Sequence, residues 1–270
     1  MNAAAESALQ ADKEFLGVDT PGFFSLTQDG TLKIIDLFRA WERLAPLWWQ
    51  HVTGTSRDAY WKSVGHFIVA RYARVTCAAQ GLEVGTRMLT RLVTSAGTRP
   101  RGAGGQEAGA VDRFEMRREA DGLLVGAVEQ AWTWIDASGA KPVVAAAPPP
   151  GLHCIQHTLA PVPALPQEDA LEEIDRFTWS ARETDPNRHV SFLSYFDRAD
   201  DALVKAEGSA GPGPFTWESW YRRECLAGEP MKMLSATRRP DGLQIEIAGA
   251  NDDIRRVVMR HCKGLGTGVA

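Results

Sequence analysis

Three polar side chains suited to hydrolysis lie close together in the second half of the chain. Asp185, Asn187 and His189 place a carboxylate, a carboxamide and an imidazole at alternate positions of a polar turn. The following residues, 190–203, carry apolar side chains at helical spacing, so the turn leads into the amino end of a helix. Such an end offers free backbone N–H groups for an oxyanion, beside a general base and an orienting amide. The pattern therefore favours attack of water on a carbonyl group.

Each of these residues also has a simpler explanation. Asp and Asn in a turn before a helix often serve only as caps, and a lone His is commonly a surface or cap residue. Only the combination favours catalysis. The remaining histidines show no metal-ligand spacing, so we predict neither a metal site nor a cofactor; they are His51, His66, His153, His157 and His261.

The overall composition is that of a globular protein. The chain has 270 residues and a mass of 29.5 kDa, enough for one large domain or two ordinary ones. Its net charge is −4, so neither nucleic acid nor a membrane is an expected partner. Residues 1–15 lack the basic flank and apolar core of a targeting signal and are expected to fray. Four widely spaced cysteines (Cys77, Cys154, Cys225 and Cys262) indicate reduced thiols, and we expect a cytoplasmic protein.

The first half of the chain reads as a short strand, a long helix and four strands. The strand is expected at 23–26, and the helix, capped by Thr31, at about 34–48. Further strands are expected at 66–77, 82–95, 111–118 and 123–135, the last two joined by a hairpin at Asp121-Gly122. Residues 97–110, rich in Gly, Ala and Arg, read as a mobile loop.

The second half repeats this order after a proline-rich stretch. A strand is expected at 174–182, a helix at 190–203, and strands at 215–225, 231–239, 243–248 and 254–262, with a hairpin at 240–242. The repeat predicts an α+β fold, the double hotdog, in which two curved antiparallel sheets each wrap around a long central helix. We place the first hotdog at 16–140, an extended linker at 141–167, and the second hotdog at 168–263. Each half is expected to cover the other's exposed sheet edge.

With this repeat in place, the chain resembles the acyl-acyl carrier protein thioesterases. Members of that family are double hotdogs whose second half carries the motif D-x-N-x-H-V-N-x-x-x-Y, and residues 185–195, ending in Tyr195, follow it. A second signature, Y-R-R-E-C, recurs at 221–225. Ser191 and Phe192 stand where the family carries Asn. The plant members' transit peptide is missing from this sequence, which implies a bacterial-type cytosolic enzyme.

The resemblance implies a catalytic network of Asp185, Asn187, His189 and Glu224. We expect Glu224, on a neighbouring strand, to act as general base, while Asn187 and His189 orient the water and Asp185 holds the network. Helix N–H groups would polarise the carbonyl. Candidate substrate-binding residues are Tyr195 and Trp41, and the first hotdog would hold the acyl pocket; the Trp-rich segments also read as plain core.

Cys225 is the alternative nucleophile, since a cysteine near a histidine can attack a thioester. On a strand Glu224 and Cys225 would point to opposite faces. The odd positions from 215 onward form the more apolar face, which favours a buried Cys225 and an accessible Glu224.

The predicted function is hydrolysis of an acyl thioester presented on acyl carrier protein or coenzyme A through phosphopantetheine. Hotdog acyltransferases and hydratases or dehydratases acting on a carrier-bound fatty acyl or polyketide group are the alternatives. Hydratases typically carry D-x-N-P-x-H, whereas His189 follows Asp185 by four residues and Asn187 precedes Arg188, which favours hydrolysis. Retention of all four polar residues argues against a non-enzymatic acyl-binding protein. Monomer and homodimer both remain open.

Overall fold

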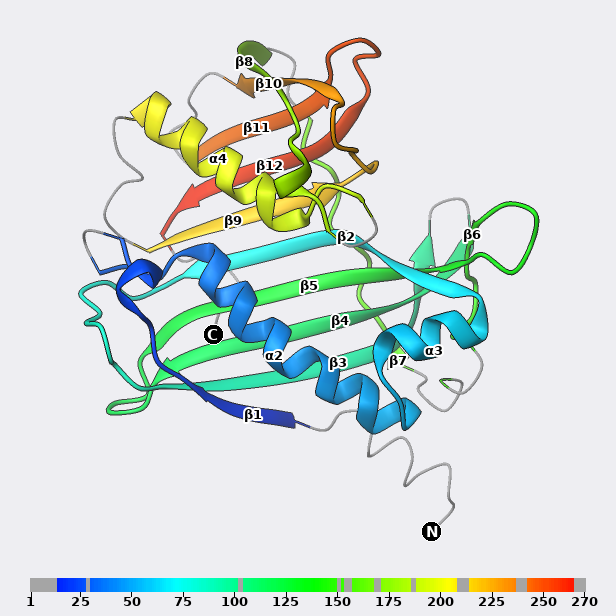
Figure 1. Cartoon of the computed structure of the whole chain (residues 1–270), viewed down its shortest axis with the longest axis horizontal. Coiled ribbons are helices and arrows are strands. Elements are labelled where there is room, and N and C mark those ends of the chain that lie inside the picture. Colours follow the sequence, from blue (N-terminus) through cyan, green and yellow to red (C-terminus); the bar gives the residue numbers. More distant parts are fainter. Residues whose placement is uncertain are drawn as a thin grey trace.

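One long antiparallel sheet runs across the molecule and carries the helices on its concave side (Figure 1). The computed structural model describes residues 14–27, 30–101, 104–149, 152, 157–167, 171–185, 188–207, 214–236 and 242–264. The strands of the first half are β1 (Glu14–Asp19), β2 (His66–Cys77), β3 (Met88–Arg101), β4 (Gly105–Arg118) and β5 (Leu124–Asp136). Those of the second half are β8 (Leu171–Thr178), β9 (Phe215–Tyr221), β10 (Pro230–Ala236), β11 (Gly242–Gly249) and β12 (Arg255–Lys263).

The strand order reads alike from both edges of the sheet. It runs β1-β3-β4-β5-β2-β9-β12-β11-β10-β8, so each half has the same internal arrangement. The halves join where β2 pairs with β9, from Tyr72 opposite Trp220 to Cys77 opposite Phe215. The predicted α+β double hotdog is confirmed, and each half covers the other's inner edge. The limits 16–140, 141–167 and 168–263 stay a prediction.

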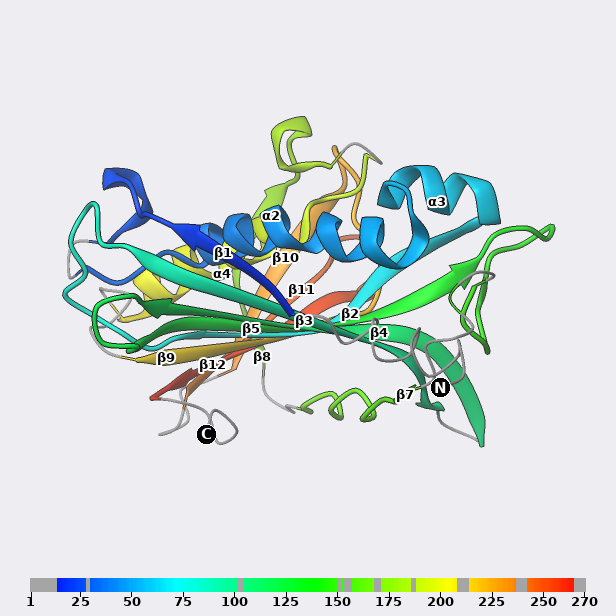
Figure 2. The same ribbon diagram turned by 90° about the horizontal axis from the view of Figure 1, so that it is seen from below.

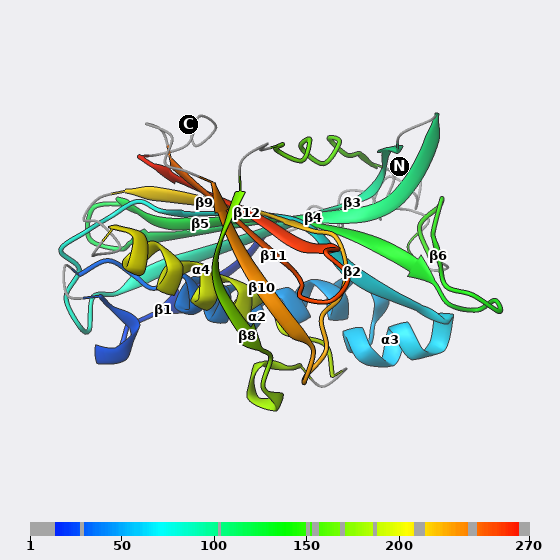
Figure 3. The ribbon, with the colours of Figure 1, turned by 90° about the horizontal axis from the view of Figure 1, so that it is seen from above.

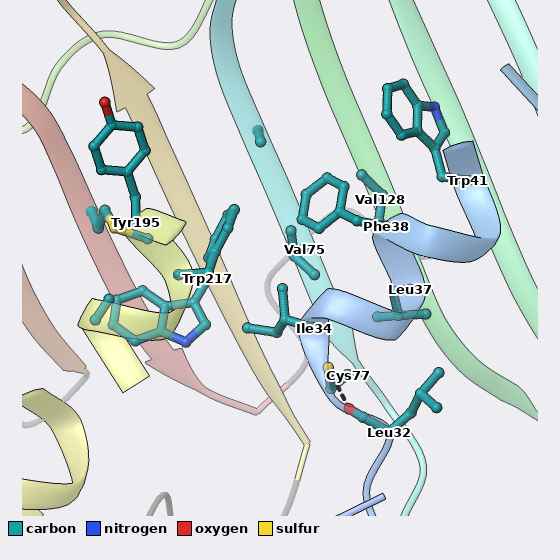
Figure 4. Packing of buried hydrophobic residues seen from close by; sticks show 14 of the residues in the cluster. Leu32, Ile34, Leu37, Phe38, Trp41, Val75, Cys77, Val128, Tyr195 and Trp217 are labelled. Carbon is teal, nitrogen blue, oxygen red and sulfur yellow. Dashed lines mark hydrogen bonds between the residues drawn. The ribbon is translucent and has the colours of Figure 1, made fainter. Parts of the chain in front are cut away.

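The central helix of the first half is α2 (Ile34–Thr53). Its apolar positions recur every three or four residues and are buried, which aligns one face of the helix with the sheet. Figure 4 shows side chains of α2 directed at the strands that carry Val75 and Val128. Gly126 permits this close approach, because a Cβ there would lie 2.7 Å from the Leu37 side chain. The helix ends at Gly54, whose φ of 72° suits glycine.

The central helix of the second half, α4 (Phe192–Glu207), lies on the same side of the sheet as α2 (Figure 3). The two helices meet through aromatic rings. The Phe38 ring centroid lies 4.9 Å from that of Phe192 and 5.5 Å from that of Phe196. The amino end of α4 is therefore packed on α2. Among the described residues, none of the helices is both long and apolar enough to cross a bilayer.

The opposite face of the sheet is covered by the segment that joins the halves (Figure 2). Two-residue strands β6 (Val143–Val144) and β7 (His157–Thr158) are its only described strands. Leu159 packs against Tyr72 and Trp220, and the Trp220 Nε1 donates to the backbone oxygen of Pro163 at 3.0 Å. The central strands are thus buried on both faces.

Several local predictions in the first half are wrong. Residues 23–26 are not a strand: η1 (Phe23–Ser25) is a 3-10 helix, and residues 14 and 15, expected to fray, belong to β1. Thr31 does not cap α2, because the N-cap is Lys33 and makes no side-chain cap bond. The short helix α3 (Arg57–Val64), capped by Ser56, was not predicted at all.

The glycine-rich loop predicted at 97–110 is in fact a long strand pair. β3 and β4 stay in register from Met88 opposite Arg118 to Arg101 opposite Gly105. Gly97 is needed for close approach, since β7 pairs with it and a Cβ there would collide with the His157 backbone. The first predicted hairpin is confirmed, with Gly122 N–H donating to the Arg118 oxygen at 2.8 Å. Most of the second, at 240–242, lies outside the described residues.

Candidate active site

The turn that precedes α4 is held by its own first residue. Asp185 N–H donates to the His189 oxygen at 2.8 Å, and Asp185 Oδ1 accepts the His189 N–H at 3.2 Å. Arg188 closes the turn by donating its N–H to the Asp185 oxygen at 2.9 Å, and its φ of 68° is left-handed. A side chain in that conformation is uncommon and costs stability. Asp185 therefore fixes the backbone that presents His189. Asn187, the third residue of the motif, lies outside the described residues.

Glu224 reaches this turn from the other side. Its Oε2 lies 3.3 Å from His189 Nε2, and the two side chains are 52% and 38% exposed, respectively. The segment that carries Glu224 is anchored at both ends: Arg222 N–H donates to the Arg256 oxygen at 2.8 Å, and the Cys225 oxygen accepts the Val190 N–H at 2.9 Å. A carboxylate and an imidazole are thus held within hydrogen-bonding reach and open to solvent.

The path by which Glu224 arrives differs from the prediction. The strand expected at 215–225 ends at Tyr221, so Glu224 lies in the loop after β9. Nor is the even-numbered side of β9 a polar surface. Glu218 is 5% exposed and accepts hydrogen bonds from Tyr72, Arg74 and Arg260. It lies on the face of the sheet that the segment joining the two halves covers. Strand alternation was therefore the wrong reason for separating Glu224 from Cys225.

Glu224 and Cys225 nevertheless lie in different environments, one exposed and the other buried. Cys225 is fully buried, and burial raises the pKa of its thiol to about 11, although a hydrogen bond with Tyr195 lowers it in part. A thiol with that pKa is almost entirely protonated at neutral pH and is a poor nucleophile. Tyr195 is likewise in the core, 4% exposed and packed edge-to-face on Trp179. It does not share the solvent exposure of the His189–Glu224 pair.

Most backbone N–H groups at the start of α4 are already used. Those of Val190 and Ser191 donate to the Cys225 and Glu183 oxygens, and those of Leu193 and Ser194 donate to Ser191. For Phe192 the described part of the chain supplies no acceptor. Among the described N–H groups at this end of α4, that of Phe192 is therefore available to bind an oxyanion.

The Phe192 side chain leads from this end of the helix into the first hotdog. Its ring centroid lies 6.3 Å from that of Trp41 and 6.4 Å from that of Trp132, and these two indoles are stacked at 5.8 Å. Trp41 is 3% exposed, so it belongs to the core, and it also lines a small cavity under α2. Its burial confirms Trp41 as a core residue, and its role in substrate binding stays a prediction.

A buried carboxyl in that cavity was missed at the sequence level. Asp112 is 6% exposed and accepts hydrogen bonds from Thr94 and Trp132. A signal was available: Asp112 alternates with Phe114 and Met116, so it had to share the inner face of its strand.

Comparisons with known proteins bear on the fold. No protein-family model and no curated protein matches the sequence. Among solved structures, an acyl-ACP thioesterase from Bacteroides thetaiotaomicron matches with a TM-score of 0.70 at 11% identity, over 98% of this chain and 100% of that one. The 12:0-ACP thioesterase from Umbellularia californica matches with a TM-score of 0.66 at 12% identity, over 92% and 96% of the two chains.

A MaoC-like dehydratase from Phytophthora capsici also matches, with a TM-score of 0.56 at 11% identity, over 98% of this chain and 99% of that one. At these identities the likeness shows the fold alone. The chain has the double hotdog architecture that those thioesterases and that dehydratase share.

Proposed function

We propose that the protein hydrolyses an acyl thioester presented on acyl carrier protein or coenzyme A through phosphopantetheine. The observation that carries the proposal is the 3.3 Å approach of Glu224 to His189 beside the amino end of α4. The motif at 185–195, the Y-R-R-E-C signature and the fold match to acyl-ACP thioesterases support it.

In the proposed reaction Glu224 takes a proton from water while the water oxygen attacks the thioester carbonyl. His189 and Asn187 orient the water, and the Phe192 N–H polarises the carbonyl oxygen. Collapse of the tetrahedral intermediate breaks the C–S bond, and the proton held by Glu224 passes to the leaving thiolate. A positioned base contributes about 10²- to 10⁴-fold, and one oxyanion donor about 10²- to 10³-fold.

Cys225 is not the nucleophile in this scheme. We expect Cys225→Ala to leave kcat within about twofold of the parent, because the buried thiol is protonated. Unfolding in urea should show a loss of about 1 kcal/mol for the small cavity created. Loss of turnover in Cys225→Ala, together with full turnover in Glu224→Gln, would reverse the assignment.

The direct test is release of free thiol from a panel of acyl-pantetheine, acyl-coenzyme A and acyl-carrier-protein thioesters of increasing chain length. Turnover of at least one member, abolished by Glu224→Gln, is expected. No thiol release from any member would contradict hydrolysis.

Hydration or dehydration is the second candidate, favoured by the match to the MaoC-like dehydratase. Enoyl thioesters in the same panel distinguish the two, because hydration removes the enoyl absorbance without releasing thiol. Faster hydration than thiol release would favour this candidate. Acyl transfer would appear as thiol release that depends on an added alcohol or amine.

A further inference from the structure

The space between α2 and the inner faces of β3, β4 and β5 holds polar groups where a pocket for a plain hydrocarbon would be apolar. The cavity measures about 10 Å³, room for one oxygen-sized group, and is lined by four indoles together with Thr94 and Asp112. The indoles are those of Trp41, Trp49, Trp132 and Trp134. Figure 4 shows Trp41 on α2 above the sheet strands.

Asp112 retains capacity for a further hydrogen bond. Its Oδ1 accepts from Thr94 Oγ1 at 2.6 Å, and its Oδ2 accepts from Trp132 Nε1 at 3.0 Å. Each carboxylate oxygen can accept more than one hydrogen bond. Burial raises the pKa of Asp112, against the lowering effect of these bonds and of the nearby Trp41 indole N–H. Both the ionised and the protonated carboxyl can bond a hydroxyl, which donates as well as accepts.

Two more buried polar groups lie on the same side of the sheet. Gln130 sits opposite Asp112 in the register and is fully buried, and neither its amide nitrogen nor its amide oxygen has a hydrogen-bond partner in the described structure. The same holds, within those residues, for Trp134 Nε1. A buried polar group left unpaired costs about 1–3 kcal/mol, so Trp134, whose side chain lines the cavity, would gain from a polar ligand group there.

The cavity adjoins the proposed reaction site through shared walls. Trp41 and Trp132 line the cavity on one side and contact Phe192 on the other, within ring-centroid distances of 6.3 and 6.4 Å. Phe192 is the first residue of α4 and follows His189 by three positions. The cavity also borders Arg57, whose side chain is 43% exposed.

We propose that this cavity receives a hydroxyl carried on the acyl group of the substrate, and that Asp112 binds this hydroxyl and so selects a hydroxylated acyl group. The inference rests on the proposed thioesterase function. An alkyl chain without a hydroxyl would offer the Asp112 carboxyl no further hydrogen bond, whereas a hydroxyl supplies both a donor and an acceptor.

Binding of uncleavable analogues tests this. S-alkyl pantetheine thioethers of one chain length, with no hydroxyl or with a hydroxyl at successive positions, are titrated calorimetrically into the full chain. We expect one hydroxyl position to bind at least about tenfold tighter than the plain analogue, the gain of one hydrogen bond to a charged group. Equal binding at every position overturns the inference and leaves the cavity as a site for one water.

Asp112→Leu should bring the hydroxyl preference below about twofold, since an apolar side chain replaces the acceptor. The control is Asp200→Asn: Asp200 is a half-buried carboxyl that also accepts from an indole, Trp217 Nε1 at 3.1 Å, but in the second hotdog. It should keep the full preference. A preference that persists in Asp112→Leu overturns the assignment to Asp112.

The wild-type comparison needs no substitution, so it decides the inference even if Asp112→Leu does not fold. The thioethers cannot be cleaved, so binding is read independently of turnover. A hydroxyl preference without thiol release from matching thioesters would leave the cavity assigned and refute hydrolysis. Thiol release without a hydroxyl preference would support hydrolysis and refute the assignment of the cavity.

Discussion

The chain makes the same turn twice, once before each central helix. In the first copy Thr27 N–H donates to the Thr31 oxygen at 2.9 Å, and Thr27 Oγ1 accepts the Thr31 N–H at 3.0 Å. In the second, Asp185 and His189 make the corresponding pair of bonds at 2.8 and 3.2 Å. The Thr27 hydroxyl and the Asp185 carboxylate thus accept hydrogen bonds from equivalent backbone N–H groups in the two turns. The capping role of Asp185 does not by itself require an acid.

The two turns differ in what covers them. Leu82 closes over the first, donating its N–H to the Gly30 oxygen at 3.0 Å, and Thr31 is only 3% exposed. At the second turn the neighbouring segment presents Glu224 instead, and the His189 side chain stays 38% exposed. The first turn, at 27–31, is therefore buried, and we call it the sealed turn. The second turn, at 185–189, is exposed and polar, and we call it the open turn. Solvent access and side-chain type, not turn geometry, separate the two.

The largest expected effect is on the open turn. Glu224→Gln should lower kcat by about 10²- to 10⁴-fold, because the amide cannot accept the proton from water. The control is Glu119→Gln, an exposed carboxylate paired with Arg87 near the first hairpin, which should turn over like the parent. Thiol release under saturating substrate measures both. Equal activity in the two variants would remove the proposed difference between the turns.

The helix that follows the open turn, α4, carries a carboxyl with a raised pKa, and this should make the stability of the protein depend on pH. α4 carries the half-buried Asp200, and desolvation raises the pKa of its carboxyl to about 7, with the Trp217 hydrogen bond opposing and repulsion from Asp197 and Asp201 adding to the rise. The folded state therefore holds a proton that the unfolded state releases near pH 4. Stability should fall as pH rises from about 4 to about 7 and level off above, by roughly 4 kcal/mol in all.

Asp200→Asn should remove this dependence, because the amide does not ionise. Urea unfolding at pH 5, 6, 7 and 8 gives the test, and subtracting the variant from the parent cancels other titrating groups such as Asp112. Parallel stability curves for the two proteins would show that Asp200 does not carry the effect.

A third prediction concerns the sealed turn. Gly30 has a φ of 74°, and a Cβ there would lie 2.8 Å from the Leu82 nitrogen. Gly30→Ala should cost about 2 kcal/mol, since backbone strain and a backbone clash act together. Chemical denaturation measures the loss. A neutral substitution would mean that Leu82 does not hold the turn closed.

Much of the fold could be predicted because its elements are long and strongly periodic. The helix stripe from Ile34 to Trp48 and the Asp121-Gly122 hairpin are local signals. The errors have non-local causes. Gly97 reads as a loop residue, but it is the point where a distant segment crosses the strand. α3 has only eight residues, about two turns, so its periodic pattern is weak.

Part of the candidate site could also be predicted from local sequence signals. The motif spacing located Asp185 and His189, and a second motif led to Glu224, which meets His189 across a loop rather than a strand. The inward position of Asp112 could have been predicted from alternation, but its contact with Thr94 could not, because the two residues meet only once the register of β3 and β4 is known. Alternation predicts which face a residue occupies, whereas contacts across strands depend on register.

The smallest expected effect is on the strain of the open turn. Arg188 occupies the position that Gly30 holds in the first turn, with a φ of 68°. Arg188→Gly should raise the free energy of unfolding by about 0.5–1 kcal/mol, since glycine takes that conformation without a steric penalty. Gly30→Ala and Arg188→Gly therefore have opposite signs at equivalent positions, and urea unfolding of both under one condition compares them. A destabilised Arg188→Gly would mean that the arginine side chain makes a favourable contact that outweighs its backbone strain.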